Sequence, residues 1–290
     1  MSASARQSTI VLILAALALA VSACGGEDDG DGNATAGSGA TGASGATGSG
    51  GAPEGSGAVP LDGPPDPELT VAEVAEELPL PEHVSDDEDF TETLDIFVAM
   101  NHKFWSESLV LSGADYHLPD EIIAYDGAAG DEGPDCGGAP AGVENAAYCR
   151  DPRNSKFGLI AWDETGLLEP LHNDLGDGST AFIIGHEFAH MVQDRLGLIQ
   201  RYPLTVEKEL AADCLTGAVF QTYTAVGVEF GPAEVKSIQD GITTVGDQPG
   251  TPWQAEHAHG LAEERQAAFD TGYSGDVDTC LKEFKPGFSQ

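Results

Sequence analysis

The sequence of 290 residues predicts an α+β fold: a helix-rich single domain with a small sheet. Three observations predict it. Several long segments carry apolar residues at helical spacing. Only two short segments have the composition of strands. All of these segments lie within residues 64–290, a length that suits one domain.

The predicted elements follow in chain order. The first helix is expected to begin at a capping box formed by Ser85 and Glu88 and to end at Gly113. The acidic residues 86–89 suit the start of that helix better than a metal site, because helix N-termini attract negative charge. The predicted helices span residues 90–111, 179–196, 204–225 and 261–272, and the predicted strands span residues 121–125 and 157–162.

The N-terminus has the pattern of an export signal. An apolar run at residues 10–21 follows a basic residue, and it is shorter than the roughly 20 residues that a membrane-spanning helix needs. Residues 1–23 are therefore predicted to be a signal peptide. Residues 19–24 resemble a bacterial lipobox, which predicts lipidation of Cys24; ordinary cleavage after Ala23 is the alternative. Lipidation would place the protein on the extracytoplasmic face of a bacterial cell membrane.

Residues 24–63 follow as a tract of Gly, Ala, Ser and Thr with a few acidic residues. Such a composition cannot bury enough apolar surface to offset its backbone entropy. We expect a flexible tether with a reach of roughly 30–36 Å. It would hold the domain at residues 64–290 away from a lipid anchor.

The charge excludes several classes of protein. The chain has 12 Lys and Arg against 49 Asp and Glu, a formal net charge of −37 at pH 7. A nucleic-acid binder needs a basic surface, and so does a protein that binds anionic lipid headgroups. Most of the acidic residues lie within residues 64–290, where they predict a solvated surface that favours solubility. Adaptation to high salt is a hypothesis consistent with that surface.

A metal-binding pattern lies in the predicted helix at residues 179–196. His186 and His190 are four residues apart and share a helix face, so both imidazoles can bind one ion. Zinc suits such ligands. Glu187 lies beside the first ligand, where it can take a proton from zinc-bound water as a general base. The alternative is a pair of histidines that only cap or pack.

A second pattern follows in the next predicted helix. Glu209 and Asp213 are also four residues apart, and Glu209 is the predicted third metal ligand because catalytic zinc commonly has two His and one Glu. Asp213 can accept a hydrogen bond from a ligand histidine and fix its tautomer. Glu207 is the nearby rival for the ligand role. One catalytic Zn²⁺ ion is the predicted cofactor.

These motifs resemble the bacterial neutral zinc metallopeptidases. The likeness covers residues 90–280 and is carried by residues 185–193, residues 209–214 with Gly217, Cys136-Gly137, Tyr148-Cys149, His259-Gly260, Arg265, Phe269, Gly272 and Cys280. The resemblance implies a zincin-like fold and a zinc site of His186, His190 and Glu209, with Glu187 as general base. The chain departs from the family pattern at Leu261-Ala262, where Thr-Ser is expected. It also lacks Gly-Pro-Phe before its Tyr-Cys.

The sequence alone does not decide how the cysteines pair or which residue donates a hydrogen bond to an oxyanion. Without Cys24 the chain has an even number of cysteines: Cys136, Cys149, Cys214 and Cys280. A disulfide between Cys136 and Cys149 is plausible and would leave the other two to pair, but three pairings are allowed. The candidate donors to a tetrahedral oxyanion are Tyr202, His257, His259 and Arg265. By analogy, the strand at residues 157–162 is expected to be an edge strand that can pair with an extended peptide.

The sequence therefore predicts a membrane-anchored, extracytoplasmic zinc-dependent endopeptidase that hydrolyses peptide bonds. Its expected partners are a peptide or protein substrate and the membrane, reached through the lipid anchor, with no nucleic acid. The alternative is a non-catalytic zinc-binding envelope lipoprotein that serves as a binding or structural module. Hydrolysis of a non-peptide amide in the cell wall is a third possibility.

Overall fold

A computed structural model describes residues 80–111, 116–151, 158–225 and 230–289, together with Leu78 and Gly113. The predicted signal peptide, the linker and the lipidation site Cys24 lie outside the described residues. The described part is helix-rich with one three-stranded sheet, which confirms the predicted α+β class. Within these ranges, no helix combines the length and apolar character needed to cross a membrane.

The elements predicted from the sequence all occur, each within two residues of its expected bounds. The structure adds strand β2 and helices α3, α6 and α8, which were not predicted. In chain order the main elements are α2 (Glu88–Leu111), β1 (Ile122–Tyr125), β2 (Ala146–Arg150), β3 (Gly158–Asp163), the π-helical turn η2 (Glu164–Leu168), α3 (Glu169–Leu175), α4 (Asp177–Arg195), α5 (Thr205–Ala225), α6 (Pro232–Thr244), α7 (Ala262–Ser274) and α8 (Val277–Glu283).

The first helix begins differently from the prediction. The Asp87 carboxylate accepts hydrogen bonds from the backbone N–H groups of Asp89 (3.0 Å) and Phe90 (3.2 Å), so Asp87 caps α2. Ser85 instead accepts a hydrogen bond from the N–H of Asp87. The predicted capping box of Ser85 and Glu88 is therefore wrong by two residues, because the acidic run offers several equivalent caps.

The sheet has the strand order β1-β3-β2, with β1 parallel and β2 antiparallel to β3. Ile160 at the centre of β3 pairs with Ile122 on one side and Tyr148 on the other. The strand predicted at residues 157–162 is thus the central strand, and the expectation that it lies at the edge is wrong. The edge strand next to the site is β2, whose short sequence gives little strand signal by itself.

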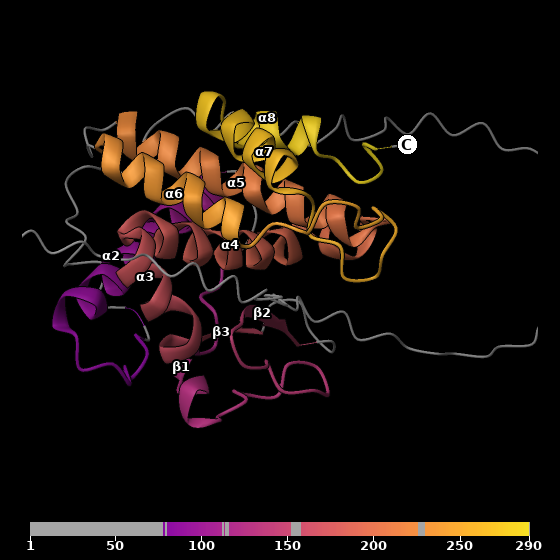
Figure 1. The fold of residues 1–290 in the computed structure, drawn as a ribbon. Helices are drawn as coiled ribbons and strands as arrows, with labels where there is room; N and C mark the ends of the chain where they lie inside the picture. Colours follow the sequence, from indigo (N-terminus) through magenta and orange to yellow (C-terminus); the bar gives the residue numbers. More distant parts are fainter. Residues whose placement is uncertain are drawn as a thin grey trace, which may run out of the picture.

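Helix α4 lies at the centre of the molecule, with the sheet below it and α5, α6, α7 and α8 above it in Figure 1. Some of these helices pack backbone to backbone through glycine. A Cβ atom at Gly217 of α5 would lie 2.1 Å from the carbonyl oxygen of Phe269 in α7, and one at Gly241 of α6 would lie 2.9 Å from Cα of Ser179 in α4. Side chains larger than hydrogen at these two positions would separate the helices.

Two disulfides link distant parts of this framework. Cys136 pairs with Cys149 and so joins a loop to β2, and Cys214 pairs with Cys280 and so joins α5 to α8. Of the three pairings that the sequence allowed, the structure contains the one with Cys136 joined to Cys149.

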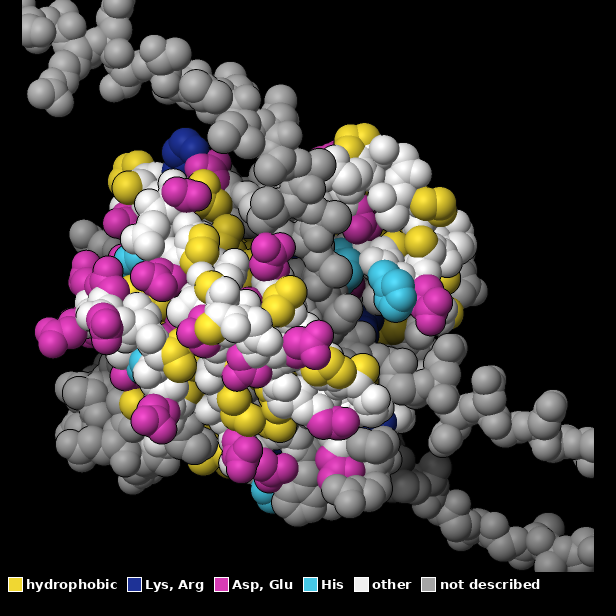
Figure 2. All heavy atoms as spheres, turned by 60° about the horizontal axis from the view of Figure 1, so that its bottom comes forward, with side chains coloured by type: hydrophobic (Ala, Val, Ile, Leu, Met, Phe, Trp, Pro, Cys, Tyr) yellow, Lys and Arg dark blue, Asp and Glu magenta, His cyan; other side chains and the backbone are white. Residues whose placement is uncertain are grey.

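Acidic side chains are spread over the face of the molecule that Figure 2 shows, with few basic ones between them. They are dispersed across this face rather than gathered in one patch. Such a distribution fits a solvated, self-repelling surface. The hypothesis of salt adaptation stays a prediction.

Candidate metal centre

The centre forms where α4 and α5 approach each other closely. Gly185 precedes the first histidine of α4, and a Cβ atom there would lie 2.7 Å from Cγ2 of Thr216 in α5. This close approach brings His186 and His190 of α4 against Glu209 of α5. All three residues are at least 98% buried.

Three possible ligand atoms converge between the two helices. Nε2 of His186 lies 3.0 Å from Oε2 of Glu209, and Nε2 of His190 lies 3.2 Å from the same oxygen. The three atoms all lie within 4.8 Å of one another. Among the described residues, this is the group of His, Cys, Asp and Glu side chains that could hold a metal ion.

Each imidazole is held from behind by an acceptor on its other nitrogen. Nδ1 of His186 lies 2.8 Å from Oδ1 of Asp213, as the sequence predicted for that carboxylate. Nδ1 of His190 lies 2.9 Å from Oε1 of Gln193, whose Nε2 donates to the carbonyl of Lys208 (2.8 Å). When Nδ1 carries the proton, Nε2 presents a lone pair, so both rings are oriented to bind a cation at Nε2.

Arg265 of α7 fixes the carboxylate behind His186. Its Nε and Nη2 atoms donate to the two oxygens of Asp213, each at 2.9 Å, and its Nη1 donates to the carbonyl of Val245. Burial by itself would raise the pKa of Asp213. The Arg265 guanidinium and the hydrogen bond with His186 have the larger effect, so the pKa of Asp213 lies below its ordinary value and the carboxylate stays ionised. Arg265 is therefore occupied in this ion pair and is not an available oxyanion donor.

Glu209 itself has an oxygen without a hydrogen bond. In the described part of the chain, its buried Oε1 atom has no hydrogen-bond partner, and Nζ of Lys208 lies 3.5 Å away. Burial raises the pKa of Glu209, but His190, Lys208 and His186 together lower it well below its usual range. An ionised carboxylate beside two imidazole nitrogens is a donor set that zinc prefers.

The spacing of the donors also fits such an ion. Ligands at about 2.0–2.1 Å from zinc in a tetrahedron lie about 3.3 Å from one another. The separations of 3.0 and 3.2 Å between the histidine nitrogens and Glu209 are close to that value. The residues present therefore fit a zinc ion.

Glu187 faces the sheet rather than the ligands. Its Oε2 atom accepts a hydrogen bond from the backbone N–H of Tyr148 in β2 at 2.7 Å, and its side chain is buried. The adjacent residues His186 and Glu187 therefore point in different directions: His186 points to α5, and Glu187 points to the edge strand β2. Glu187 follows His186 directly in the chain, but its carboxylate is not among the converging ligand atoms.

The other candidates of the sequence analysis lie in different environments. Tyr202 donates its hydroxyl to the carbonyl of Phe284 (3.1 Å), and His257 is exposed. His259 is buried, with 7% of its surface exposed. The rival ligand Glu207 accepts a hydrogen bond from the N–H of Gly287 (2.9 Å), so it holds the C-terminal segment and not a metal.

Gln193 contacts the candidate ligand His190, and the sequence analysis did not assign it that position. The available signal is its spacing of three residues from His190, which places the two side chains on neighbouring parts of one helix face. Its role also depends on the carbonyl of Lys208, which a sequence does not place.

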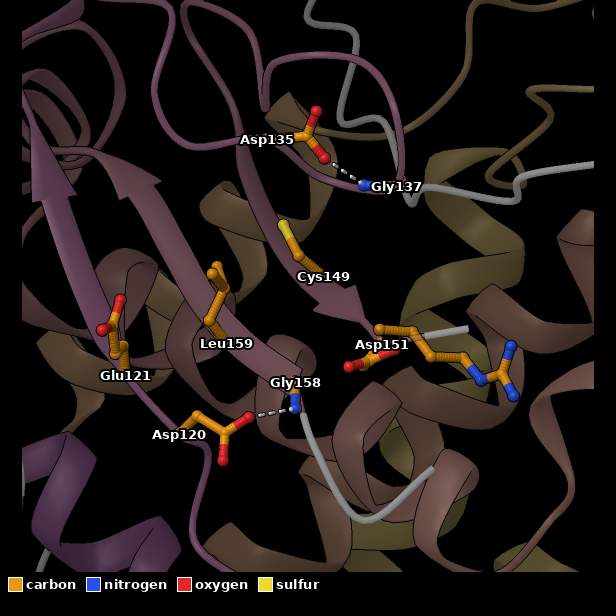
Figure 3. Close-up of a pocket in the computed structure, with 9 residues that line it drawn as sticks. Asp120, Glu121, Asp135, Gly137, Cys149, Asp151, Gly158 and Leu159 are labelled. Atoms are coloured by element: carbon orange, nitrogen blue, oxygen red, sulfur yellow. Dashed lines mark hydrogen bonds between the residues drawn. The ribbon is translucent and has the colours of Figure 1, made fainter. Parts of the chain in front are cut away.

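A separate cavity of about 500 Å³ lies beside β2 and β3, away from the three ligand residues. Figure 3 shows its acidic lining. Oδ2 of Asp120 accepts the N–H of Gly158 (3.0 Å), and Oδ1 of Asp135 accepts the N–H of Gly137 (3.2 Å). These carboxylates stabilise loops, and the cavity contains none of the proposed chemical groups.

Comparisons with known proteins agree with this centre. Residues 70–282 match the model of the family described as "Putative neutral zinc metallopeptidase". Uncharacterized proteins of Mycobacterium bovis and Mycobacterium tuberculosis are each 29% identical over 181 residues, which cover 52% of this chain and 59% of each relative. The chain therefore spans less than two thirds of the length of these curated relatives. No solved structure matches. The family match covers most of the chain and includes all residues of the candidate metal centre, and so this chain belongs to the family described as "Putative neutral zinc metallopeptidase".

Proposed function

We propose that the protein is a zinc-dependent endopeptidase that hydrolyses peptide bonds on the extracytoplasmic face of a bacterial membrane. The observation that carries this proposal is the arrangement of His186, His190 and Glu209 around one point, with Glu187 fixed beside it. Those three residues would hold the ion. When bound, zinc supplies a Lewis acid that polarises a carbonyl group and lowers the pKa of water.

The protein's own residues then handle the proton and the geometry. Glu187 takes the proton of the attacking water and returns it to the leaving amine, and the N–H of Tyr148 keeps its carboxylate in place. Asp213 and Gln193 hold the two imidazoles, so the ligand set needs little rearrangement. The edge strand β2 passes Glu187 at Tyr148, its middle residue, and would offer backbone groups of its outer edge to an extended peptide.

Lipidation of Cys24 would anchor this domain to the membrane through the linker at residues 24–63. The partners are then a peptide or protein substrate and the lipid bilayer. The support is the lipobox-like sequence alone. A Cys24→Ser protein should leave the membrane fraction, and one that stayed membrane-bound would contradict lipidation.

A direct test compares the wild-type protein with Glu187→Gln. Both should contain about one zinc ion when measured by elemental analysis, because Glu187 is not among the converging ligand atoms. Only the wild type should cleave casein or a peptide library. Loss of a catalytic base costs roughly 10²–10⁴-fold in rate. Equal cleavage by both, or no zinc in the wild type, would contradict the proposal. Zinc without cleavage would favour a non-catalytic binding module.

A further inference from the structure

His259 is a buried histidine next to the metal centre that the centre does not use. Its Nε2 atom has no hydrogen-bond partner among the residues that the structure describes, and the residue is only 7% exposed. Its Nδ1 atom lies 3.9 Å from Oδ1 of Asp247, which is too long for a hydrogen bond. A buried polar atom without a partner costs free energy, so it calls for a function or a missing ligand.

The segment around His259 packs against α5 at the metal ligand. Ala258 belongs to a buried cluster with Val206 and Leu210, the α5 residues on either side of Glu209. On the other side of His259, a Cβ atom at Gly260 would lie 3.1 Å from Cδ2 of Leu210. The histidine between them is therefore held beside the α5 segment that carries Glu209, and the charge of Glu209 acts on it.

The backbone of this segment is fixed by one carboxylate. Oδ2 of Asp247 accepts the N–H groups of His259 (2.8 Å) and Gly260 (2.9 Å), and the N–H of Asp247 donates to the carbonyl of Gly260 (2.9 Å). Gly260 has φ +97°, which favours glycine. His259 is thus held in place before any substrate binds, which is the property that electrostatic catalysis requires.

We propose that His259 is a catalytic residue whose Nε2–H donates a hydrogen bond to the scissile carbonyl oxygen as that oxygen gains negative charge. The proposal rests on the peptidase function given above. Of the four donors that the sequence offered, Tyr202 and Arg265 are occupied and His257 is exposed. No proton leaves His259 in this step: the hydrogen bond strengthens as the oxyanion forms and weakens as it collapses.

The state of the ring agrees with this role. A neutral imidazole carries one N–H, which can sit on either ring nitrogen. Because Oδ1 of Asp247 lies too far from Nδ1 for a hydrogen bond, that proton can reside on Nε2.

The test uses the full-length, zinc-loaded protein with four substitutions. His259→Ala and His259→Phe remove the donor, the second at nearly constant volume, and whichever of them folds by near-ultraviolet circular dichroism is used. His259→Gln keeps an amide N–H. His257→Ala is the matched control, because it changes an exposed histidine two residues away.

Two readouts separate catalysis from structure. With a peptide that the wild type cleaves, loss of the donor should lower kcat by about 10²–10³-fold with little change in KM. Methylphosphonate, a tetrahedral oxyanion probe, should bind the donor-free variant at least about tenfold more weakly by ³¹P nuclear magnetic resonance. Gln should restore part of both losses, His257→Ala should change neither, and zinc content should stay the same.

The outcomes distinguish this proposal from the proposed function. Unchanged kcat and methylphosphonate affinity would overturn the role of His259, as would a loss of zinc in the donor-free variant, which would make His259 a ligand. If the wild type cleaves no peptide, the peptidase function fails. The loss of methylphosphonate affinity would then still support His259 as a donor to an oxyanion.

Discussion

Buried carboxylates in two regions of the molecule have opposite surroundings. At the sheet, Asp163 and Glu164 are fully buried, and each of their carboxylate oxygens has a hydrogen-bond partner. Asp163 accepts the N–H groups of Gly127 (2.9 Å), Gly166 (2.7 Å) and Glu144 (2.7 Å). At the helix interface, Glu209 is equally buried, yet within the described chain its Oε1 has no hydrogen bond and its Oε2 faces two imidazole nitrogens.

This difference separates carboxylates that stabilise the fold from a candidate metal ligand. A carboxylate whose oxygens all accept hydrogen bonds stabilises the fold, because it pairs with backbone N–H groups that would otherwise be buried without partners. A carboxylate with an oxygen that accepts no hydrogen bond keeps lone pairs free to bind a metal ion. The following substitutions test that distinction, beginning with the largest expected change in free energy.

Removal of the Asp163 carboxylate, which accepts three backbone hydrogen bonds, should cost the most stability. Asp163→Ala leaves three N–H groups without their acceptor, and we expect a loss of about 3–5 kcal/mol in the free energy of unfolding, with or without zinc. Urea denaturation of the metal-free protein measures it. The exposed Asp270→Ala should change the same quantity by less than about 0.5 kcal/mol. A loss below 1 kcal/mol for Asp163→Ala would contradict the structural role.

Neutralising the Glu209 carboxylate should weaken metal binding more than it weakens the fold. Glu209→Gln keeps the volume of the side chain but removes a charged ligand, so zinc affinity should fall by more than about 100-fold, beyond the usual cost of altering an outer-shell partner. Competition with a chelator measures this. The metal-free protein should lose less stability than it loses with Asp163→Ala, because the glutamine oxygen can still face Nε2 of His186 and His190. Unaltered zinc affinity would remove Glu209 from the ligand set.

The acceptor behind the second imidazole should have an intermediate effect. Gln193→Leu removes the oxygen that holds Nδ1 of His190, and we expect zinc affinity to fall by about 10–100-fold. Gln193→Glu keeps an acceptor and should retain most of the affinity. The exposed Gln239→Leu is the control for the change in side-chain type. If Leu and Glu at position 193 behave alike, the contact does not orient the ring.

The parts of this site that the sequence could predict are those encoded locally. His186 and His190, and then Glu209 and Asp213, are pairs at helical spacing, so each pair could be placed on one face. The metal-binding pattern also implied that these two helices approach each other, but the other contacts between distant segments were not predictable. The sequence does not show that Asp163 accepts backbone N–H groups from three separate segments. Strand β2 is short, and only its pairing with β3 and the hydrogen bond from Tyr148 to Glu187 define its place.

The smallest expected effect concerns Glu164, the second buried carboxylate at the sheet, and its hydrogen-bond partner His83. His83 lies between Glu164 (2.7 Å) and Asp95 (3.0 Å), with one acceptor at each ring nitrogen. Burial lowers the pKa of His83, but its hydrogen bonds to Asp95 and Glu164 outweigh burial and raise the pKa to about 9. A raised pKa means that the folded state holds the proton more tightly than the unfolded state does.

The stabilisation from protonated His83 is therefore complete below about pH 6.5 and is lost as the pH rises through 9. Because Asp95, one of the two partners of His83, is 31% exposed, water screens part of this interaction, and we expect a loss of about 1 kcal/mol. Unfolding free energies measured from pH 6 to 9.5 for the wild type and His83→Gln should differ by an amount that shrinks toward high pH. A constant difference would show that His83 contributes by packing and not by charge. In that case the sheet carboxylate Glu164 would owe its saturation to its backbone partners, the N–H groups of Val84 and Ser85.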